Sequence, residues 1–116
     1  MRTRDMRAVP AQITSATLAL PFSLSVCRAG RYRVVEIGGE LDVATRNLAR
    51  RACLAGRRKA VIVEMGAMTF MDCSGYGALV VARLALQERG GSLTLRNQAG
   101  QPAELLDLIA SLEVTS

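Results

Sequence analysis

The sequence predicts a single α/β domain with a mixed sheet of four to five strands and helices packed mainly on one face. Near the start, two segments typical of strands are separated by a short turn, which indicates a β-hairpin. After this hairpin, strand patterns alternate with helix patterns, as in parallel crossover units. The chain has 116 residues, of which 50% are hydrophobic, and this suffices for one modest core. The expected order of elements is β-β-α-β-α-β-α.

The hairpin is expected to begin with Phe22–Val26, where apolar and polar residues alternate. Cys27 would then share one face of this strand with Ser23 and Ser25. The turn "RAGR" follows, and Tyr32–Ile37 is expected to return as the second strand of the hairpin.

The first helix is expected over Val43–Ala55. Asp42 can cap it, because an aspartate carboxylate accepts hydrogen bonds from the unpaired N–H groups of a first helical turn. Gly56 is a suitable residue for the end of this helix. Its expected buried stripe consists of Ala44, Leu48 and Ala52.

The segment Ala60–Met65 is almost continuously apolar, which is typical of a central strand. Gly66–Asp72 is expected to be a loop that leads into a second helix over Ser74–Arg89. Two glycines end that helix, and Ser92–Asn97 alternates again as a strand should.

The last helix is expected to start at Pro102, with Glu104 complementing the helix dipole. Its predicted buried stripe consists of Leu105, Leu108, Ile109 and Leu112. The final residues, 113–116, have the pattern of a further short strand. We therefore expect a flexible N-terminal extension over residues 1–20 and one folded domain over residues 21–116.

The composition excludes several kinds of site. The chain has no histidine, which excludes histidine-based acid–base catalysis and most transition-metal sites. Its three cysteines, Cys27, Cys53 and Cys73, form no CxxC pair, so neither a zinc site nor a disulfide framework is indicated. We expect no cofactor, no metal and a reducing, cytoplasmic setting.

The net charge of +5 suggests an acidic partner, and most of the basic residues lie in the first half of the chain. No helix-turn-helix signature accompanies them, and only 3% of residues are aromatic. Direct nucleic-acid binding is therefore not expected. No apolar segment approaches the ~20 residues of a membrane span, so no membrane association is expected either. A monomer or weak dimer is expected.

The second helix is apolar nearly all round from Tyr76 to Ala82. A helix on one face of a sheet needs only one apolar stripe, so the surplus suggests an exposed patch for a protein partner. The candidates are Tyr76, Leu79 and Val80. Deeper burial under a neighbouring helix is the alternative explanation.

Three blocks of the sequence carry a resemblance to a known family: "VVEIGGELDVATRNL", "AVIVEMGAMTFMDCSGYGAL" and "RGGSLTLRNQAGQPAELLDLIASL". The chain resembles a STAS domain, specifically a bacterial anti-sigma factor antagonist, from about Phe22 to Thr115. The middle block is similar to the family's switch motif, usually D-S-[ST]-G-L-G at the start of a helix. We call Asp72–Gly77 the switch segment.

Each residue of the switch segment can be compared with the motif. Asp72, Ser74, Gly75 and Gly77 match it, whereas Tyr76 stands where leucine is usual. Outside the segment, Asp42 matches the acid of a "G-x-L-D" block expected to lie beside the switch. The resemblance implies a partner-binding surface made of Asp42, Asp72, Ser74, Gly75, Tyr76 and Gly77. We expect Gly75→Arg to abolish association with the partner and to leave the domain folded.

The resemblance also implies a function. Such an antagonist binds an anti-sigma factor, often one with a serine-kinase domain, and so frees a sigma factor for transcription. The kinase commonly phosphorylates the first serine of the motif, and this position is Cys73 here. A thiol cannot replace serine as the phosphate acceptor, so Cys73 is expected either to be passive or to act as a redox switch. Ser74 is the alternative phosphoacceptor.

Two other functions compete with this one. Cys73 at a helix N-terminus could be the nucleophile of an enzyme, but the chain offers no histidine partner, and we expect no catalysis. A STAS domain could instead serve as a subunit of a lipid-transport complex or as a scaffold in a stress-sensing assembly. That alternative shares the fold, so only the identity of the partners can distinguish it.

Overall fold

The computed structural model describes residues 22–57 and 59–115. In chain order its elements are β1 (Phe22–Ala29), β2 (Tyr32–Leu41), α1 (Arg46–Leu54), β3 (Ala60–Glu64), β4 (Met68–Met71), α2 (Cys73–Glu88), β5 (Ser92–Arg96) and α3 (Gly100–Thr115). The predicted fold class is confirmed, because the chain forms one α/β domain with a five-stranded mixed sheet. The extension predicted over residues 1–20 lies outside the described residues.

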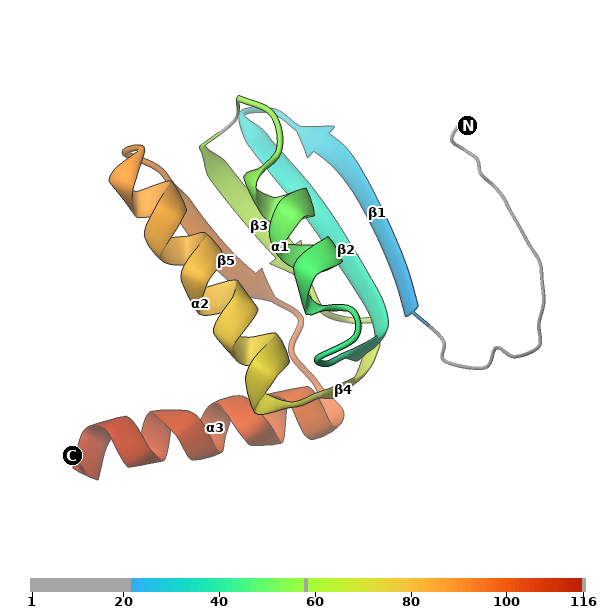
Figure 1. The fold of residues 1–116 in the computed structure, drawn as a ribbon, viewed down its shortest axis with the longest axis vertical. Coiled ribbons are helices and arrows are strands. Elements are labelled where there is room, and N and C mark those ends of the chain that lie inside the picture. Colours follow the sequence, from blue (N-terminus) through green and yellow to red (C-terminus); the bar gives the residue numbers. More distant parts are fainter. Residues whose placement is uncertain (1–21, 58, 116) are drawn as a thin grey trace.

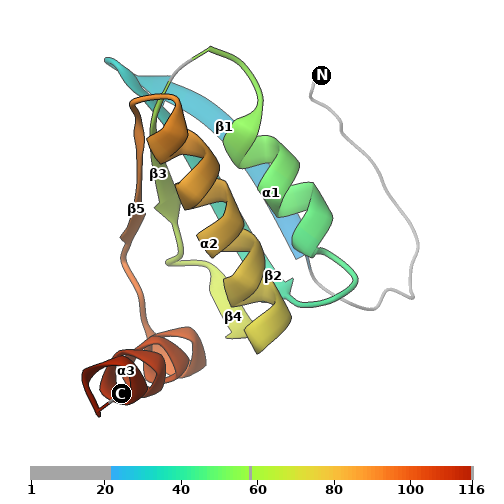
Figure 2. The same cartoon turned by 60° about the vertical axis from the view of Figure 1, so that its left-hand side comes forward.

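The sheet has the hairpin at one edge and β5 at the other (Figure 1). β1 pairs antiparallel with β2, while β3 runs parallel to both β2 and β5. The crossover helices α1 and α2 lie on the same face of the sheet, as Figure 2 shows. Parallel strands therefore direct their carboxyl ends toward the end of the domain at which α2 begins.

The predicted hairpin is confirmed, and both of its strands are longer than expected. Ala29 pairs with Tyr32, so only Gly30 and Arg31 form the loop. Gly30 has a φ of 60°, a conformation that glycine adopts without steric cost. Short hairpin loops of this kind fix the register of the strands that they join.

The strand β4 was missed because its burial pattern does not alternate. Met68 and Met71 are buried, whereas Thr69 and Phe70 between them are exposed. β4 pairs in parallel with the end of β2, beyond the stretch that pairs with β3, and the register shifts between Gly39 and Glu40. The loop predicted between β3 and α2 thus contains a short strand that leads into the switch segment.

The core lies between the sheet and the two crossover helices. Its buried aliphatic, methionine and cysteine side chains are Val35, Ile37, Leu41, Ala49, Cys53, Val61, Val63, Met65, Met68, Met71, Leu79, Ala82, Leu86 and Leu93. Methionine fills irregular space well, and three methionines lie around β4 at the end of the domain where α2 begins. No aromatic residue belongs to this buried set, as the composition indicated.

The first helix starts later than predicted. α1 begins at Arg46 with Thr45 at the N-cap position, so the prediction that Asp42 caps this helix is wrong. The Asp42 carboxylate instead closes the preceding turn, where its Oδ1 accepts from the Ala44 N–H over 3.0 Å. The Asp42 carbonyl oxygen accepts from the Arg46 N–H over 2.8 Å.

The predicted stripe of α1 is wrong at Ala44 and Leu48, whereas Ala52 is partly buried against the core. Ala49 and Cys53 are buried, while Leu48 is 45% exposed. Ala44 lies before the helix and is exposed. The two buried residues, Ala49 and Cys53, are spaced i and i+4, and each follows a residue of the predicted stripe by one position.

The C-terminal helix differs from its prediction in two ways. α3 continues to Thr115, so the further strand predicted at the end does not form. Its predicted stripe is only partly buried, since Leu108 is 57% and Leu112 is 60% exposed. The start of α3 packs beside β4 with Pro102 buried, and the rest extends past the body of the domain (Figure 1).

Candidate functional site

The switch segment lies at the end of the domain where two parallel strands finish. Leu41 of β2 pairs with Met71 of β4, and an aspartate follows each of them. The Asp72 N–H donates to the Leu41 carbonyl oxygen over 3.2 Å, which continues this pairing by one residue. The register therefore places Asp42 beside Asp72, as expected from the "G-x-L-D" block.

Asp72 is the N-cap of α2. Its Oδ1 accepts from the Gly75 N–H over 2.8 Å and from the Ser74 hydroxyl over 2.7 Å. The Ser74 hydrogen bond is the main cause that holds the pKa of Asp72 below its usual value, and the Gly75 N–H and the Arg46 charge act in the same direction. The cap therefore favours an ionised carboxylate at the start of the switch segment.

Cys73 and Ser74 have different surroundings although they are adjacent. Cys73 is the first residue of α2 and is exposed, so the helix starts one residue before the predicted Ser74. Ser74 is half-buried and faces the side of α2 on which α1 lies. The thiol is thus open to solvent, whereas the hydroxyl is bonded to the cap and borders a groove.

Gly75 is buried beneath the switch segment. A Cβ at this position would overlap the carbonyl oxygen of Leu41, so glycine permits the start of α2 to approach the end of β2. The expectation that Gly75→Arg leaves the domain folded is therefore wrong. Gly77 is different, since nothing lies within 4 Å of a Cβ built there.

A groove between α1 and α2 begins at Ser74 and has a volume of about 280 Å³. We call it the α1–α2 groove. It is lined by Arg46, Asn47, Arg50, Ser74, Gly77, Ala78 and Val81. The sequence prediction missed its two arginines, although their i, i+4 spacing in α1 was a signal that they share one side of the helix.

The exposed apolar residues of α2 are not those predicted. Leu79 is buried, and Tyr76 and Val80 are half-buried. Val81 and Leu84 are 49% and 55% exposed. The surplus apolar surface thus exists, but it continues from the α1–α2 groove along the outer side of α2.

Sequence reasoning also missed the contact that attaches α3 to the switch region. The Gln101 side chain accepts from the Met71 N–H over 2.8 Å and donates to the Met71 carbonyl oxygen over 2.9 Å. It occupies the free edge of β4 as a neighbouring strand would. Gln101 therefore stabilises the residue that immediately precedes the Asp72 cap.

The three cysteines lie in different parts of the domain. Cys27 and Cys73 are exposed, while Cys53 is buried in α1. Burial raises the pKa of the Cys53 thiol to about 11, and the Arg33 charge opposes this only in part. No three histidine, cysteine or acidic side chains come together as a metal site within the described residues. Among the helices that the structure describes, none has the length and apolarity needed to cross a membrane.

Fold and site together define a small α/β domain that presents a capped helix N-terminus beside a groove. The model of the STAS domain family matches residues 24–114, and the chain belongs to this family. The resemblance identified from the sequence is therefore confirmed. No match was found among curated proteins.

The solved structures that are similar to this chain include three anti-sigma factor antagonists. An antisigma-factor antagonist STAS domain from Rhodobacter sphaeroides is 23% identical, with a TM-score of 0.56, and the match covers 68% of this chain and 88% of that one. The anti-sigma factor antagonist SpoIIAA in its unphosphorylated form is 25% identical, with a TM-score of 0.56 and coverages of 68% and 74%. An anti-sigma factor antagonist from Mycobacterium paratuberculosis is 20% identical, with a TM-score of 0.64 and 82% of both chains covered.

Proposed function

We propose that this chain is an anti-sigma factor antagonist, which binds an anti-sigma factor and thereby frees a sigma factor for transcription. Three similar structures carry the name of such antagonists, and the chain belongs to the STAS domain family. The observation that carries the proposal is the position of the switch segment, which caps an exposed helix end beside the α1–α2 groove. The protein acts by binding in the cytoplasm, and it is not an enzyme.

The proposed partner surface surrounds the start of α2. Five of its members are partly exposed and so accessible to a partner: Asp42, Asp72, Ser74, Tyr76 and Gly77. Gly75 supports this surface from below, because it allows α2 to lie against Leu41. Arg46 and Arg50 extend the surface along the α1–α2 groove, so an acidic segment of the anti-sigma factor would be complementary to it.

We further propose that Cys73 is passive and that no phosphate is transferred to it. Its exposed thiol is not bonded to the Asp72 cap. Cys53 is a poor disulfide partner for it, because Cys53 lies near the end of α1 whereas Cys73 lies at the start of α2, at the opposite end of the domain (Figure 2). In the redox alternative, oxidation beyond sulfenic acid would place an anion at this exposed position. Binding of the partner by reduced and by peroxide-treated protein separates the two proposals, with Cys73→Ala as the control.

Ser74 is the other residue of the switch segment that a kinase-type anti-sigma factor could phosphorylate. The Ser74 hydroxyl donates a hydrogen bond to Asp72 Oδ1 over 2.7 Å, and Ser74 borders the groove that contains Arg46 and Arg50. A phosphate on Ser74 would add about two negative charges near these arginines. Incubation of the partner and the protein with ATP, followed by mass spectrometry, tests this alternative against Ser74→Ala.

Capture of partners from the native cytoplasm tests the function itself. The tagged full chain should retain an anti-sigma factor that mass spectrometry identifies. A lipid-transport complex or a stress-sensing assembly recovered in its place would contradict the proposed function and support the alternative role of a STAS domain. The same capture with a variant of the switch segment shows whether retention depends on this surface.

A further inference from the structure

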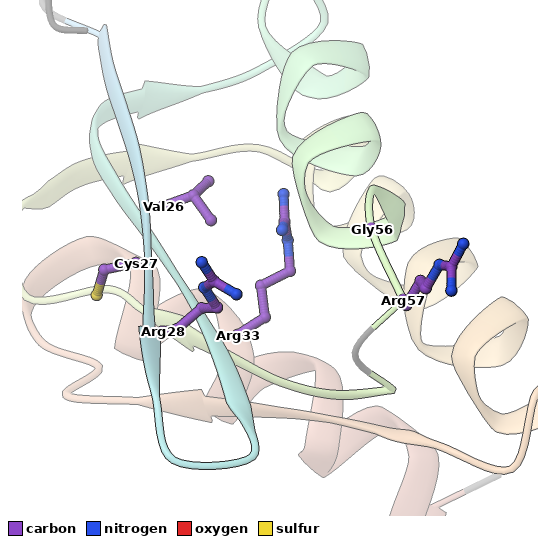
Figure 3. A pocket seen from close by; sticks show the side chains of 6 residues that line it. All are labelled: Val26, Cys27, Arg28, Arg33, Gly56 and Arg57. Atoms are coloured by element: carbon purple, nitrogen blue, oxygen red, sulfur yellow. The ribbon is translucent and has the colours of Figure 1, made fainter. Parts of the chain in front are cut away.

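Two arginines lie directly opposite each other at the end of the hairpin. Arg28 of β1 pairs with Arg33 of β2, so both side chains leave the same face of the sheet. Figure 3 shows them next to each other beside the end of α1, with the Cys27 sulfur directed to the other side of the hairpin. Like charges at directly opposite positions destabilise a pair of strands, so this arrangement needs an explanation.

A structural contact within the domain explains the position of Arg33 but not that of Arg28. The Arg33 Nε donates to the Ala52 carbonyl oxygen over 2.9 Å, which satisfies the C-terminal end of α1. Gly56 has a φ of 77°, and a side chain there would press on the Arg33 guanidinium, so the loop is shaped around this arginine. Within residues 22–57 and 59–115, no carboxylate forms an ion pair with Arg28 or Arg33.

The two arginines border a hollow of about 460 Å³, which we call the hairpin hollow. It is lined by Val26, Cys27, Arg28, Arg33, Gly56 and Arg57. A second hollow of about 440 Å³ adjoins it and is lined by Arg31, Arg57, Lys59, Ala60, Gly90, Gly91 and Ser92. Arg57 belongs to both, and no acidic residue lines either one.

We propose that these two hollows form one binding site for a small ligand that carries two or more phosphoryl groups. One phosphoryl group would lie between Arg28 and Arg33 and relieve their repulsion, because guanidinium groups bind phosphate through paired hydrogen bonds. A second would lie across Arg57, toward Lys59. The site is at the opposite end of α1 and α2 from the switch segment, so it does not depend on the proposed function (Figure 1).

The shape of this end favours a small ligand over a nucleic acid or a membrane. The cations surround hollows instead of following a continuous stripe, and the nearby aromatic ring of Tyr32 is covered by Arg31 at 5.3 Å. Only one exposed large apolar side chain, Val26, lines the described hollows, which is little for insertion into lipid.

Calorimetric titration of the full chain with sodium tripolyphosphate at low ionic strength tests the site. Tripolyphosphate should bind at least about tenfold more tightly than inorganic phosphate, since it reaches both hollows. Arg28→Gln and Arg57→Gln should each weaken its binding at least about fivefold, because each loses a charge-assisted contact. Arg83→Gln removes the same charge from α2 outside both hollows, and it should change the affinity less than about twofold.

Thermal unfolding without ligand adds a second readout. Arg28→Gln should not lower the Tm, because it removes repulsion from Arg33, and tripolyphosphate should raise the Tm of wild type more than that of this variant. The proposal would be overturned if Arg83→Gln weakened tripolyphosphate binding as much as Arg28→Gln and Arg57→Gln do. It would also be overturned if inorganic phosphate bound as tightly as tripolyphosphate. Binding of anionic vesicles or duplex DNA with the same arginine dependence, but without binding of tripolyphosphate, would overturn it in favour of those partners.

Discussion

The Ser74 hydroxyl donates to Asp72 Oδ1 over 2.7 Å, so the acid and the hydroxyl of the switch segment form one bonded unit. Cys73 lies between them in sequence but is exposed to solvent. Because the same carboxylate also caps α2 through the Gly75 N–H, a change at Ser74 acts on the cap as well as on the surface. The switch segment therefore couples the stability of the start of α2 to the groups that a partner would contact.

Removal of the Asp72 cap should destabilise the domain. Asp72→Ala leaves the Gly75 N–H without its acceptor, and we expect the free energy of unfolding to fall by about 1 kcal/mol. Urea denaturation measures this change. Asp107→Ala removes an exposed acid from α3 and serves as the control, with an expected change within about 0.5 kcal/mol. Equal effects of the two substitutions would argue against a capping role.

Asp72 should also contribute to the pH dependence of stability. Its pKa is lower in the folded state than the ~3.9 of an unperturbed aspartate, so its contribution is complete above that value. The contribution is lost as the pH falls through the folded-state pKa. Asp72→Asn retains a capping side chain without this titration, so the stability gap between wild type and variant should narrow toward acidic pH. A gap that stays constant between pH ~6 and pH ~2 would contradict this assignment.

The two glycines of the switch segment should respond oppositely to alanine. Gly75→Ala forces a Cβ against the Leu41 carbonyl group, and we expect a loss of at least about 2 kcal/mol in the free energy of unfolding. Gly77→Ala meets no neighbouring atom within 4 Å and gains helix propensity, so we expect a gain of up to about 1 kcal/mol. Denaturation of both variants under one set of conditions checks the pair, and similar losses in both would contradict the geometry.

The cysteines should differ in their reaction with an alkylating reagent. Cys27 and Cys73 are exposed and should be modified in the native protein. Cys53 is buried, its pKa is raised to about 11, and the thiolate is the reactive form, so it should react only after denaturation. Mass spectrometry after brief labelling measures the site of each adduct. Rapid modification of Cys53 in the native state would show that α1 opens readily from the sheet.

Sequence patterns predicted the elements whose periodicity reflects one buried face. The hairpin was found in this way, and α2 was expected to start at Ser74, one residue after its actual start at Cys73. The strand β4 escaped because Thr69 and Phe70 are both exposed, so the strand shows no alternation. The exposure of the second half of α3 was not predicted either, because a leucine stripe does not show where the element that it packs against ends.

Sequence reasoning selected the switch segment, but it did not predict how the structure arranges its residues and their neighbours. Gly75 and Gly77 look equivalent in the motif, yet only Gly75 meets the backbone of a distant strand. The part of Arg46 and Arg50 depends on how α1 is oriented against α2, which tertiary packing determines. The contact of Gln101 with Met71 joins residues 30 positions apart, and no local pattern indicates such a contact.

Binding of the captured anti-sigma factor to wild type, Gly77→Arg and Gln87→Arg tests the central claim most directly. Both substitutions add the same side chain to α2, but only Gly77 lines the α1–α2 groove, and Gln87 is exposed farther along the helix. A bulky cation at the centre of an interface should weaken binding at least about tenfold, whereas Gln87→Arg should leave the Kd within about twofold. Both variants should remain folded by circular dichroism. An unchanged Kd for Gly77→Arg would contradict the proposal that the switch segment and the α1–α2 groove form the partner surface.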